Sequence, residues 1–186
     1  MQERPFIVIS GLPAAGKTAI GRYVAARMDL PFLDKDEFLE REFEKYDSVD
    51  LELRQKLSRK SDEAMSAKAA ALGAGVLVSF WRPTDRAVAY GTATGWLSEQ
   101  TAPVIELYCQ CDPQIARQRF VTRTRHPGHN DALRLDSLVT QFQELELDGP
   151  LGLWPLVTVD TSDLSDISRL GNKAISRLLA LLNQNS

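Results

Sequence analysis

The sequence predicts an α/β fold in which five parallel strands lie between layers of helices. Short apolar runs, rich in β-branched and aromatic side chains, alternate with helical stretches, as expected for buried parallel strands joined by crossover helices. Each run is followed by a polar or glycine-bearing turn. The five runs cover residues 6–9, 31–33, 76–80, 104–109 and 156–159, and we expect the first of them to be the central strand.

Length and composition point to one globular domain over residues 1–186. Hydrophobic residues make up 44% and charged residues 25% of the 186 positions, which excludes collagen-like, coiled-coil and mostly disordered chains. The net charge of −3 argues against a protein that coats nucleic acid by bulk charge. Cys109 and Cys111 are too close in sequence to stabilise the fold through a disulfide, and two cysteines are too few for a zinc site. We find no export signal or membrane span, and we expect a cytoplasmic protein.

Helical patterns fill the intervals between these runs. A helix should begin near Gly16, with apolar residues at intervals of four facing the sheet. The long charged segment 37–72 should hold at least two helices, ending in strong helix formers and a glycine. Residues 84–100 predict a further helix, and residues 165–183 carry an apolar stripe typical of a helix packed on the sheet.

The most specific motif is the segment GLPAAGKT at residues 11–18, which fits G-x-x-x-x-G-K-[ST] and lies between an apolar strand and a helix. Backbone N–H groups of such a loop converge on phosphate oxygens, and the following helix adds its positive N-terminal end. Lys17 should reach the β- and γ-phosphates, and the Thr18 hydroxyl should ligate Mg²⁺. The alternative is a glycine-bearing turn with a solvated lysine. The residues expected to bind nucleotide here are Gly11, Ala14, Ala15, Gly16, Lys17, Thr18 and Ala19.

With this motif the chain resembles the P-loop kinases of small substrates, a group that includes gluconate and shikimate kinases, chloramphenicol phosphotransferase and 5′-hydroxyl polynucleotide kinases. The resemblance also rests on segments 32–38, 117–129 and 159–162, which are less specific than the loop. It implies a three-layer P-loop NTPase fold of the nucleoside and shikimate kinase type. It further implies an acceptor-binding helical insertion near 37–72 and a lid near 117–131.

In such kinases an acidic residue after the second strand contacts the acceptor hydroxyl, and Asp36 occupies the matching place. A carboxylate there can orient the hydroxyl and accept its proton during phosphoryl transfer. Asp34 is the alternative, and both residues are assigned to substrate binding. Asp36 could instead serve only to cap the helix that starts near Glu37.

Four arginines fall within the nine residues 117–125, and in a helix Arg119 and Arg123 would share a face. The resemblance implies that lid arginines close over the phosphates and the adenine. We therefore assign Arg119 and Arg123 to the nucleotide, with Arg125 the next candidate, and name Lys17, Asp36 and Arg123 as catalytic. A solvated helix face is the alternative for this cluster. His126 and His129 flank a turn and could contact substrate or simply lie on the surface.

The third apolar run ends at Ser79, where Walker-B chemistry would place an aspartate. Mg²⁺ would then be held by Thr18, the nucleotide and waters, with Asp36 as a further candidate. Asp160 ends the last strand and belongs either to a base-binding turn or to an ordinary turn and helix cap. Arg82, beside Trp81, could line an acceptor pocket at the carboxyl end of the sheet, or this part could be packing.

These residues together predict ATP- and Mg²⁺-dependent transfer of the γ-phosphoryl group to a hydroxyl of a small molecule. A nucleic-acid 5′-hydroxyl kinase is the second hypothesis, which the acidic balance and the lack of a basic, aromatic track outside the lid disfavour. A nucleotide-dependent switch module without enzymatic activity is the third. The expected partners are ATP and a small-molecule acceptor, with neither a membrane nor nucleic acid, and the sequence does not fix the oligomeric state.

Overall fold

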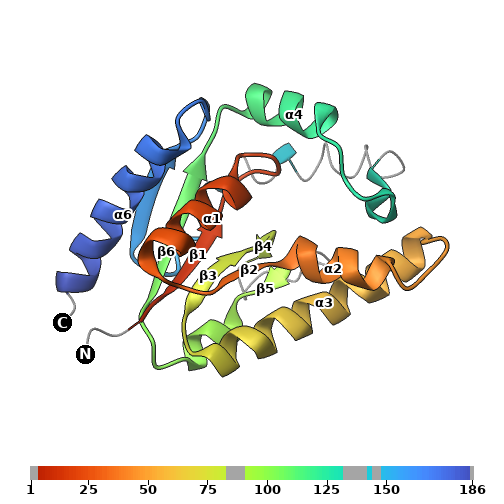
Figure 1. Cartoon of the computed structure of the whole chain (residues 1–186), viewed down its shortest axis with the longest axis horizontal. Helices are drawn as coiled ribbons and strands as arrows, with labels where there is room; N and C mark the ends of the chain where they lie inside the picture. Colours follow the sequence, from red (N-terminus) through yellow and green to blue (C-terminus); the bar gives the residue numbers. More distant parts are fainter. Residues whose placement is uncertain (1–3, 83–90, 132–141, 144–147, 185–186) are drawn as a thin grey trace.

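A computed structural model describes residues 4–82, 91–131, 142–143 and 148–184. Its central sheet has five parallel strands in the order β2-β3-β1-β6-β7, and β1 pairs with β3 on one side and β6 on the other. The strands are β1 (Phe6–Ser10), β2 (Phe32–Asp34), β3 (Gly75–Val78), β6 (Val104–Gln110) and β7 (Leu156–Asp160). The predicted fold class and the central position of the first strand are thereby confirmed (Figure 1).

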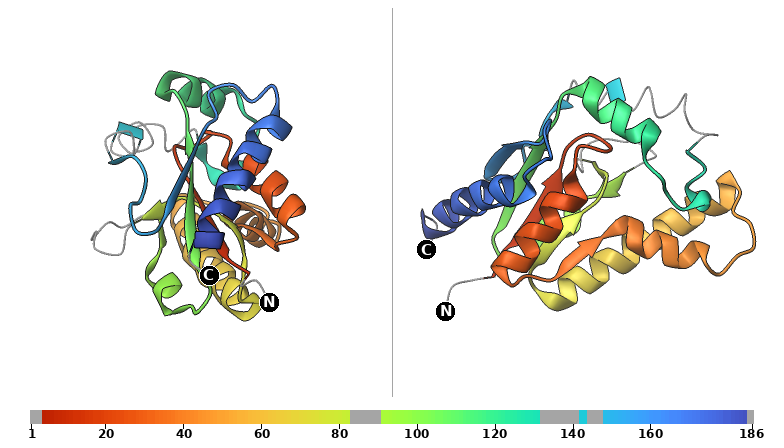
Figure 2. Two further views of the ribbon diagram at one scale, coloured as in Figure 1. Left: turned by 90° about the vertical axis from the view of Figure 1, so that its left-hand side faces the viewer. Right: turned by 45° about the horizontal axis from the view of Figure 1, so that its top comes forward.

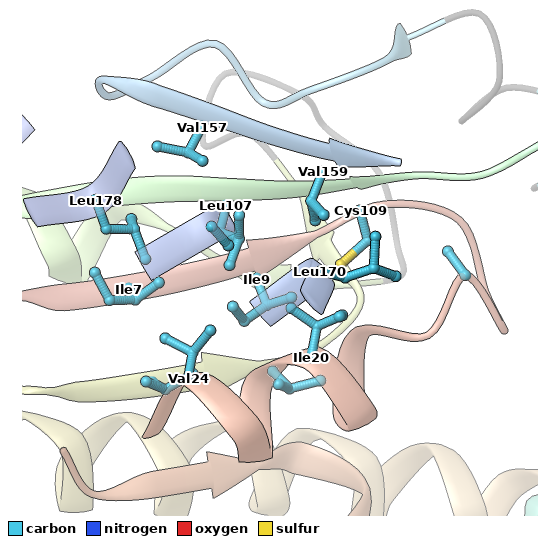
Figure 3. Packing of buried hydrophobic residues seen from close by; sticks show 14 of the residues in the cluster. Ile7, Ile9, Ile20, Val24, Leu107, Cys109, Val157, Val159, Leu170 and Leu178 are labelled. Atoms are coloured by element: carbon cyan, nitrogen blue, oxygen red, sulfur yellow. The ribbon is translucent and has the colours of Figure 1, made fainter. Parts of the chain in front are cut away.

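Helices cover both faces of this sheet because the side chains of β1 alternate between two apolar clusters. Ile7 and Ile9 pack with residues of α1 (Lys17–Met28) and α6 (Ile167–Gln184), and Figure 3 shows Ile20, Val24, Leu170 and Leu178 around them. Phe6 and Val8 face the opposite side, where they pack with Met65 and Ala69 of α3 (Leu51–Leu72). The first strand is therefore buried on both faces, as a central parallel strand should be.

Two helices of the predicted insertion lie next to each other and project from the sheet. They are α2 (Lys35–Phe43) and α3, and Figure 2 shows them extending past the carboxyl end of the strands. On the other side of that end lies α4 (Pro113–Thr122), which follows β6 and leads into the short 3₁₀ helix η2 (Pro127–His129). The carboxyl edge of the sheet is thus flanked by the two segments expected to hold the acceptor and the lid.

The helix predicted over 84–100 is wrong in its second half, while residues 84–90 lie outside the described part of the chain. Residues 91–100 form the two-residue strand β5 (Thr92–Ala93) and the 3₁₀ helix η1 (Gly95–Glu99). Gly91 adopts a positive φ of 84°, which an α-helix does not allow, and the Thr92 N–H donates to the Phe80 carbonyl at 2.7 Å. Residues 92–93 are therefore extended and pair with β4 (Trp81–Arg82), so they cannot be part of a helix.

Within the residues that the structure describes, no helix combines the length and the apolar character needed to cross a membrane.

Candidate active site

The loop between β1 and α1 has the backbone geometry of a phosphate cradle. Gly11 has a φ of 127°, and a Cβ there would lie 2.5 Å from the Cys109 carbonyl oxygen, so only glycine fits. Gly16 caps α1 with a φ of 92° and no side-chain hydrogen bond, which leaves the first N–H groups of the helix directed at the loop. A helix N-terminus of this kind attracts an anion through its unpaired N–H groups and its dipole.

Lys17 is folded back onto this loop. Its Nζ donates to the carbonyl oxygens of Gly11 at 2.9 Å and Leu12 at 2.8 Å. Burial lowers the pKa of Lys17 to about 8, although the nearby Asp36 and Asp34 carboxylates favour its charged form. The ammonium group is therefore held at the mouth of the cradle, where phosphate oxygens would be stronger acceptors than the two carbonyls.

Asp34 connects this cradle with the next helix. Its Oδ2 accepts a 2.8 Å hydrogen bond from the Thr18 hydroxyl, and its Oδ1 accepts from the Asp36 N–H at 3.0 Å. Burial, and then repulsion from Asp36, raises the pKa of Asp34 to about 6. Because Asp34 caps α2, the expectation that Asp36 could be only a helix cap is wrong. Asp34 and Thr18 together present hard oxygen ligands of the type Mg²⁺ takes.

Asp36 lies in the first turn of α2 and forms an ion pair with Arg125. Partial burial by itself would raise the pKa of Asp36, but Arg125, His129 and Lys35 outweigh this effect and lower it. Arg125 also contacts Asp131 at 3.2 Å, so its guanidinium group lies between two carboxylates. The structure therefore brings the expected acceptor-binding residue and an arginine of the expected lid into direct contact.

The remaining arginines are placed differently from one another. Arg119, on α4, donates to the carbonyl oxygens of Thr161 at 2.8 Å and Ser162 at 2.6 Å, in the turn after β7. Arg123 is the C-cap of α4, with an extended ψ of 144°, so it does not share a helical face with Arg119 as the sequence suggested. Its guanidinium carbon lies 4.2 Å from the centre of the Phe120 ring, and among the described residues its buried Nε has no hydrogen-bond partner.

Burial, and then the neighbouring Arg125, lowers the pKa of Arg123 to about 10. The two guanidinium groups lie near each other, and both reach the Asp131 carboxylate, while Arg125 also pairs with Asp36. A charge held in this way favours an approaching anion, which is what the predicted nucleotide contact requires. The assignment of Arg119, Arg123 and Arg125 to the nucleotide stays a prediction.

His129 is buried against α2 and not on the surface. Its Nε2 lies 2.9 Å from Glu40 Oε1, and its ring meets the Phe43 ring edge-on at 5.2 Å. His126 stacks on the same Phe43 ring at 5.3 Å. Sequence reasoning left the roles of the two histidines open, and it did not anticipate Glu40 or Phe43. The signal that could have found them is their spacing with Asp36 along one helix.

A polar network that the sequence did not reveal lies where β3 ends. Ser79 contacts the Thr92 hydroxyl, which donates to Asp62 of α3. Asp62 also faces the Lys35 ammonium at 3.5 Å, and Lys35 donates to Ser58 at 2.6 Å. The serine at the Walker-B position thus connects the end of β3 with Thr92 of β5 and, through Thr92, with Asp62 of α3.

Trp81 is a packing residue, as one of its two interpretations proposed. It is 5% exposed, belongs to the cluster of Phe6 and Val8, and donates from Nε1 to the Ile9 carbonyl at 2.9 Å. Arg82 follows it in β4 and is half-buried, so its role in acceptor binding stays a prediction. A cavity of about 20 Å³ beside Trp81 also borders Gly11 and Leu12 of the cradle.

Asp160 accepts a hydrogen bond from the Ser162 N–H at 2.9 Å and therefore stabilises the turn after β7. Arg119 of α4 donates its hydrogen bonds to carbonyl oxygens of this same turn. Its contacts are those of an ordinary turn residue and not of a helix cap, since α6 begins only at Ile167, and a role of this turn in binding the nucleotide base stays a prediction.

Comparisons with known proteins agree with this geometry. Residues 13–73 match the family model of shikimate kinase. A putative kinase from Chloroflexus aurantiacus is similar in structure with a TM-score of 0.70 and 21% identity, over 97% of this chain and 98% of that one. A search of curated proteins gave no match.

Two further solved structures share the fold at lower similarity. Shikimate kinase from Bacteroides thetaiotaomicron has a TM-score of 0.56 and 18% identity, covering 96% of this chain and 98% of its own. A gluconokinase from Sinorhizobium meliloti has a TM-score of 0.54 and 17% identity, covering 99% and 97%. The resemblance to P-loop kinases of small molecules, and the shikimate-kinase-like P-loop fold, are thereby confirmed.

Proposed function

We propose that this chain is a phosphotransferase that moves the γ-phosphoryl group of ATP to a hydroxyl of a small molecule, with Mg²⁺ bound. The observation that carries the proposal is the juxtaposition of the cradle at residues 11–18 with the carboxylates of Asp34 and Asp36. The matches to shikimate kinase, a gluconokinase and a putative kinase support the same class of reaction.

The donor half of the site would be formed by the cradle and the arginines beyond α4. Loop N–H groups and Lys17 bind the β- and γ-phosphates, and Arg123 balances the charge that develops on the transferring group. Arg119 fixes the turn at Thr161 and Ser162, where the nucleotide base would lie. These residues lower the barrier by positioning and charge neutralisation, which supply most of the rate in phosphoryl transfer.

Thr18 and Asp34 are the residues that would hold Mg²⁺, since their oxygens lie 2.8 Å apart beside the cradle. The ion supplies neutralisation of the phosphate oxygens when it is bound. In this proposal Asp34 takes the metal-binding role of the Walker-B aspartate, whose position is occupied by Ser79. One or two protein oxygens suffice for such a site because the phosphates and waters complete the coordination.

Asp36 would bind and orient the acceptor hydroxyl. Its lowered pKa keeps the carboxylate ionised at neutral pH, so it can accept the hydroxyl hydrogen bond and take the proton as the phosphoryl group leaves ATP. Asp34 is the less suitable candidate because both of its oxygens already accept hydrogen bonds, from Thr18 and from the Asp36 N–H. Arg125 holds Asp36 until the acceptor arrives.

The proposal is tested by incubating the protein with labelled ATP, Mg²⁺ and a panel of sugars, sugar acids, cyclitols and short 5′-hydroxyl oligonucleotides. We expect label to move to a small molecule, and Asp36→Asn to reduce this transfer on the order of a hundredfold or more, as loss of a general base does. Asp47→Asn, an exposed aspartate between α2 and α3, is the matched control and should keep full activity.

Two outcomes would contradict the proposal. Transfer only to the oligonucleotides would favour the nucleic-acid kinase. Tight ATP binding without transfer to any acceptor would favour the nucleotide-dependent switch.

A further inference from the structure

One face of α2 carries three residues that contact the same distant segment of the chain. Asp36, Glu40 and Phe43 are four and then three positions apart, so they line up along the helix. Residues 125–130, which we call the lid strip, lie along this line. The first contact is the ion pair of Arg125 with Asp36. The second is the 2.9 Å hydrogen bond between His129 and Glu40.

The third contact is made by the Phe43 ring, which lies between the lid strip and the apolar cluster of Leu39 and Leu57. His126 stacks on it with an interplanar angle of 28°, and His129 meets it at 89°. Gly128 lies so close that a Cβ there would be 2.6 Å from the ring. Contact of this kind leaves no room for the strip to shift along the helix without losing packing.

Helix α3 and the loop before it hold the same strip from a second direction. Arg54 donates from Nε to the His129 carbonyl at 2.8 Å, and the Asn130 side chain donates to the Val49 carbonyl at 2.7 Å. By contrast, Arg119 in α4 is bonded to the turn after β7. The lid strip is therefore anchored to α2, α3 and the loop before α3, whereas α4 is anchored to the turn after β7, where the nucleotide base would lie.

We propose that Glu40 and Phe43 are positioning residues for the reaction: they seat the lid strip on α2 and thereby set the Arg125 guanidinium against Asp36. This inference rests on the proposed function, in which Asp36 binds the acceptor hydroxyl. Neither positioning residue touches the reacting groups, and each acts through Arg125.

The physical need for such a seat follows from the arginine side chain. Arg125 has four rotatable bonds, so its side chain loses rotamer entropy when it is fixed in one place. It also has a second carboxylate within reach, since Asp131 lies at 3.2 Å. The contacts of residues 126, 128 and 129 fix the backbone next to Arg125 and so restrict the positions of its guanidinium group. In the permitted position the group pairs with Asp36 as well as with Asp131.

The test measures the coupling between Asp36 and Arg125 without any substrate. Urea unfolding of the full chain with Asp36→Asn, Arg125→Gln and both changes gives the coupling as a ratio of unfolding equilibrium constants. We expect a ratio on the order of tenfold, the middle of the range for residues in one ion-pair network. The same cycle is then repeated in backgrounds that carry Gly128→Ala or Glu40→Ala.

A matched control background carries Glu42→Ala. Glu42 is on α2 as well, but it pairs with Lys45 and Lys60 and not with the lid strip. We expect the coupling to fall toward onefold with Gly128→Ala, to fall severalfold with Glu40→Ala, and to stay unchanged with Glu42→Ala. A role limited to stability would lower the unfolding free energy in all three backgrounds and leave the ratio intact.

An unchanged ratio in the Glu40→Ala background would overturn the inference, and this variant decides the matter if Gly128→Ala does not fold. Because the cycle needs neither ATP nor acceptor, its result is separate from the transfer assay. A protein that labels no acceptor but shows the expected loss of coupling would refute the proposed function alone.

Discussion

Ala14 shows how one residue of the cradle is placed under backbone strain. It has a φ of 61°, in the left-handed region that costs a non-glycine residue about 1–2 kcal/mol. Glycine in the same place would avoid this cost but would lose more entropy on folding, roughly 0.5–1 kcal/mol. The cradle conformation is therefore maintained by the surrounding structure, in particular by the close approach of Gly11 to Cys109.

We expect Ala14→Gly to raise the unfolding free energy by about 0.5–1 kcal/mol, the difference of these two effects. Urea denaturation measures this directly. The control is Ala15→Gly, a fully buried neighbour whose φ is not positive, which should lower the unfolding free energy by about 1 kcal/mol. Equal destabilisation by both changes would show that Ala14 is not strained.

Asp34 and Asp36 show how two carboxylates two residues apart acquire different properties. Asp34 is 5% exposed and its pKa is raised, whereas Asp36 is open to the lid strip and its pKa is lowered by Arg125 against the effect of partial burial. Two residues, from the strand end that caps α2 to its first turn, are sufficient to separate the two environments. In our proposal the position of Asp34 beside Thr18 assigns it to the metal, and the lowered pKa of Asp36 suits it to the acceptor hydroxyl.

Among the elements, α3 depends on its N-cap. The Asp50 side chain accepts from the Leu53 N–H at 2.8 Å at the start of this 22-residue helix. We expect Asp50→Ala to reduce the unfolding free energy by about 1 kcal/mol, because an orphan N–H group of the first turn loses its partner. Thermal melts should show a reduction that Asp47→Ala does not produce, and equal melting temperatures for the two variants would contradict the capping role.

The packing of the lid strip on α2 should make stability depend on pH. Burial, and then the positive charge of Arg125, lowers the pKa of His129, although Asp36, Glu40 and Asp131 oppose this. The folded protein then binds the proton more weakly than the unfolded chain, whose histidine pKa is about 6.5. The stabilisation is complete above about pH 6.5 and is lost as the pH falls from there toward the lowered folded pKa.

Protonation of His129 should therefore lower the unfolding free energy between pH 7 and pH 5, whereas protonation of Asp34, whose folded pKa is raised to about 6, raises it over the same range. We expect His129→Gln to remove the first of these two contributions and so to shift the pH dependence toward higher stability at pH 5. Chemical denaturation at several pH values checks it. If the His129→Gln variant keeps the wild-type pH dependence, protonation of His129 does not contribute.

At the scale of the whole molecule, the nucleotide would stabilise the fold because only the folded chain forms the cradle. Ligand at a hundredfold excess over Kd contributes about 2.7 kcal/mol. For a chain of this size that corresponds to an increase in Tm of roughly 5–10 °C. We expect this increase with ATP and Mg²⁺, and we expect Lys17→Ala to abolish most of it.

Lys17→Ala should itself melt close to the wild-type temperature, since its ammonium group bonds only to loop carbonyls in the described structure. A thermal melt with and without ATP, together with calorimetric titration, separates the two effects. A variant that unfolds without ligand would instead mean that Lys17 is a structural residue of the loop.

What the sequence determined is local. The five strands and the cradle at residues 11–18 follow from apolar periodicity and from glycine and lysine at fixed positions, because these features depend on neighbours along the chain. The central place of the first strand was expected from the resemblance to P-loop kinases, since its partners β3 and β6 are distant in the sequence. Residues 84–100 were mispredicted in part because the conformation at Thr92 is set by pairing with Trp81, which periodicity does not register.

The tertiary structure decided which charged groups meet. Asp36 and Arg125 are 89 positions apart, as are Glu40 and His129, and no spacing in the sequence joins them. It also placed Arg123 beyond the end of α4, buried His129, and gave Asp34 rather than Asp36 the cap of α2. Ion pairs and burial depend on distances that only the packed sheet and its helices fix, which is why the site's electrostatics could not be derived from the residue order alone.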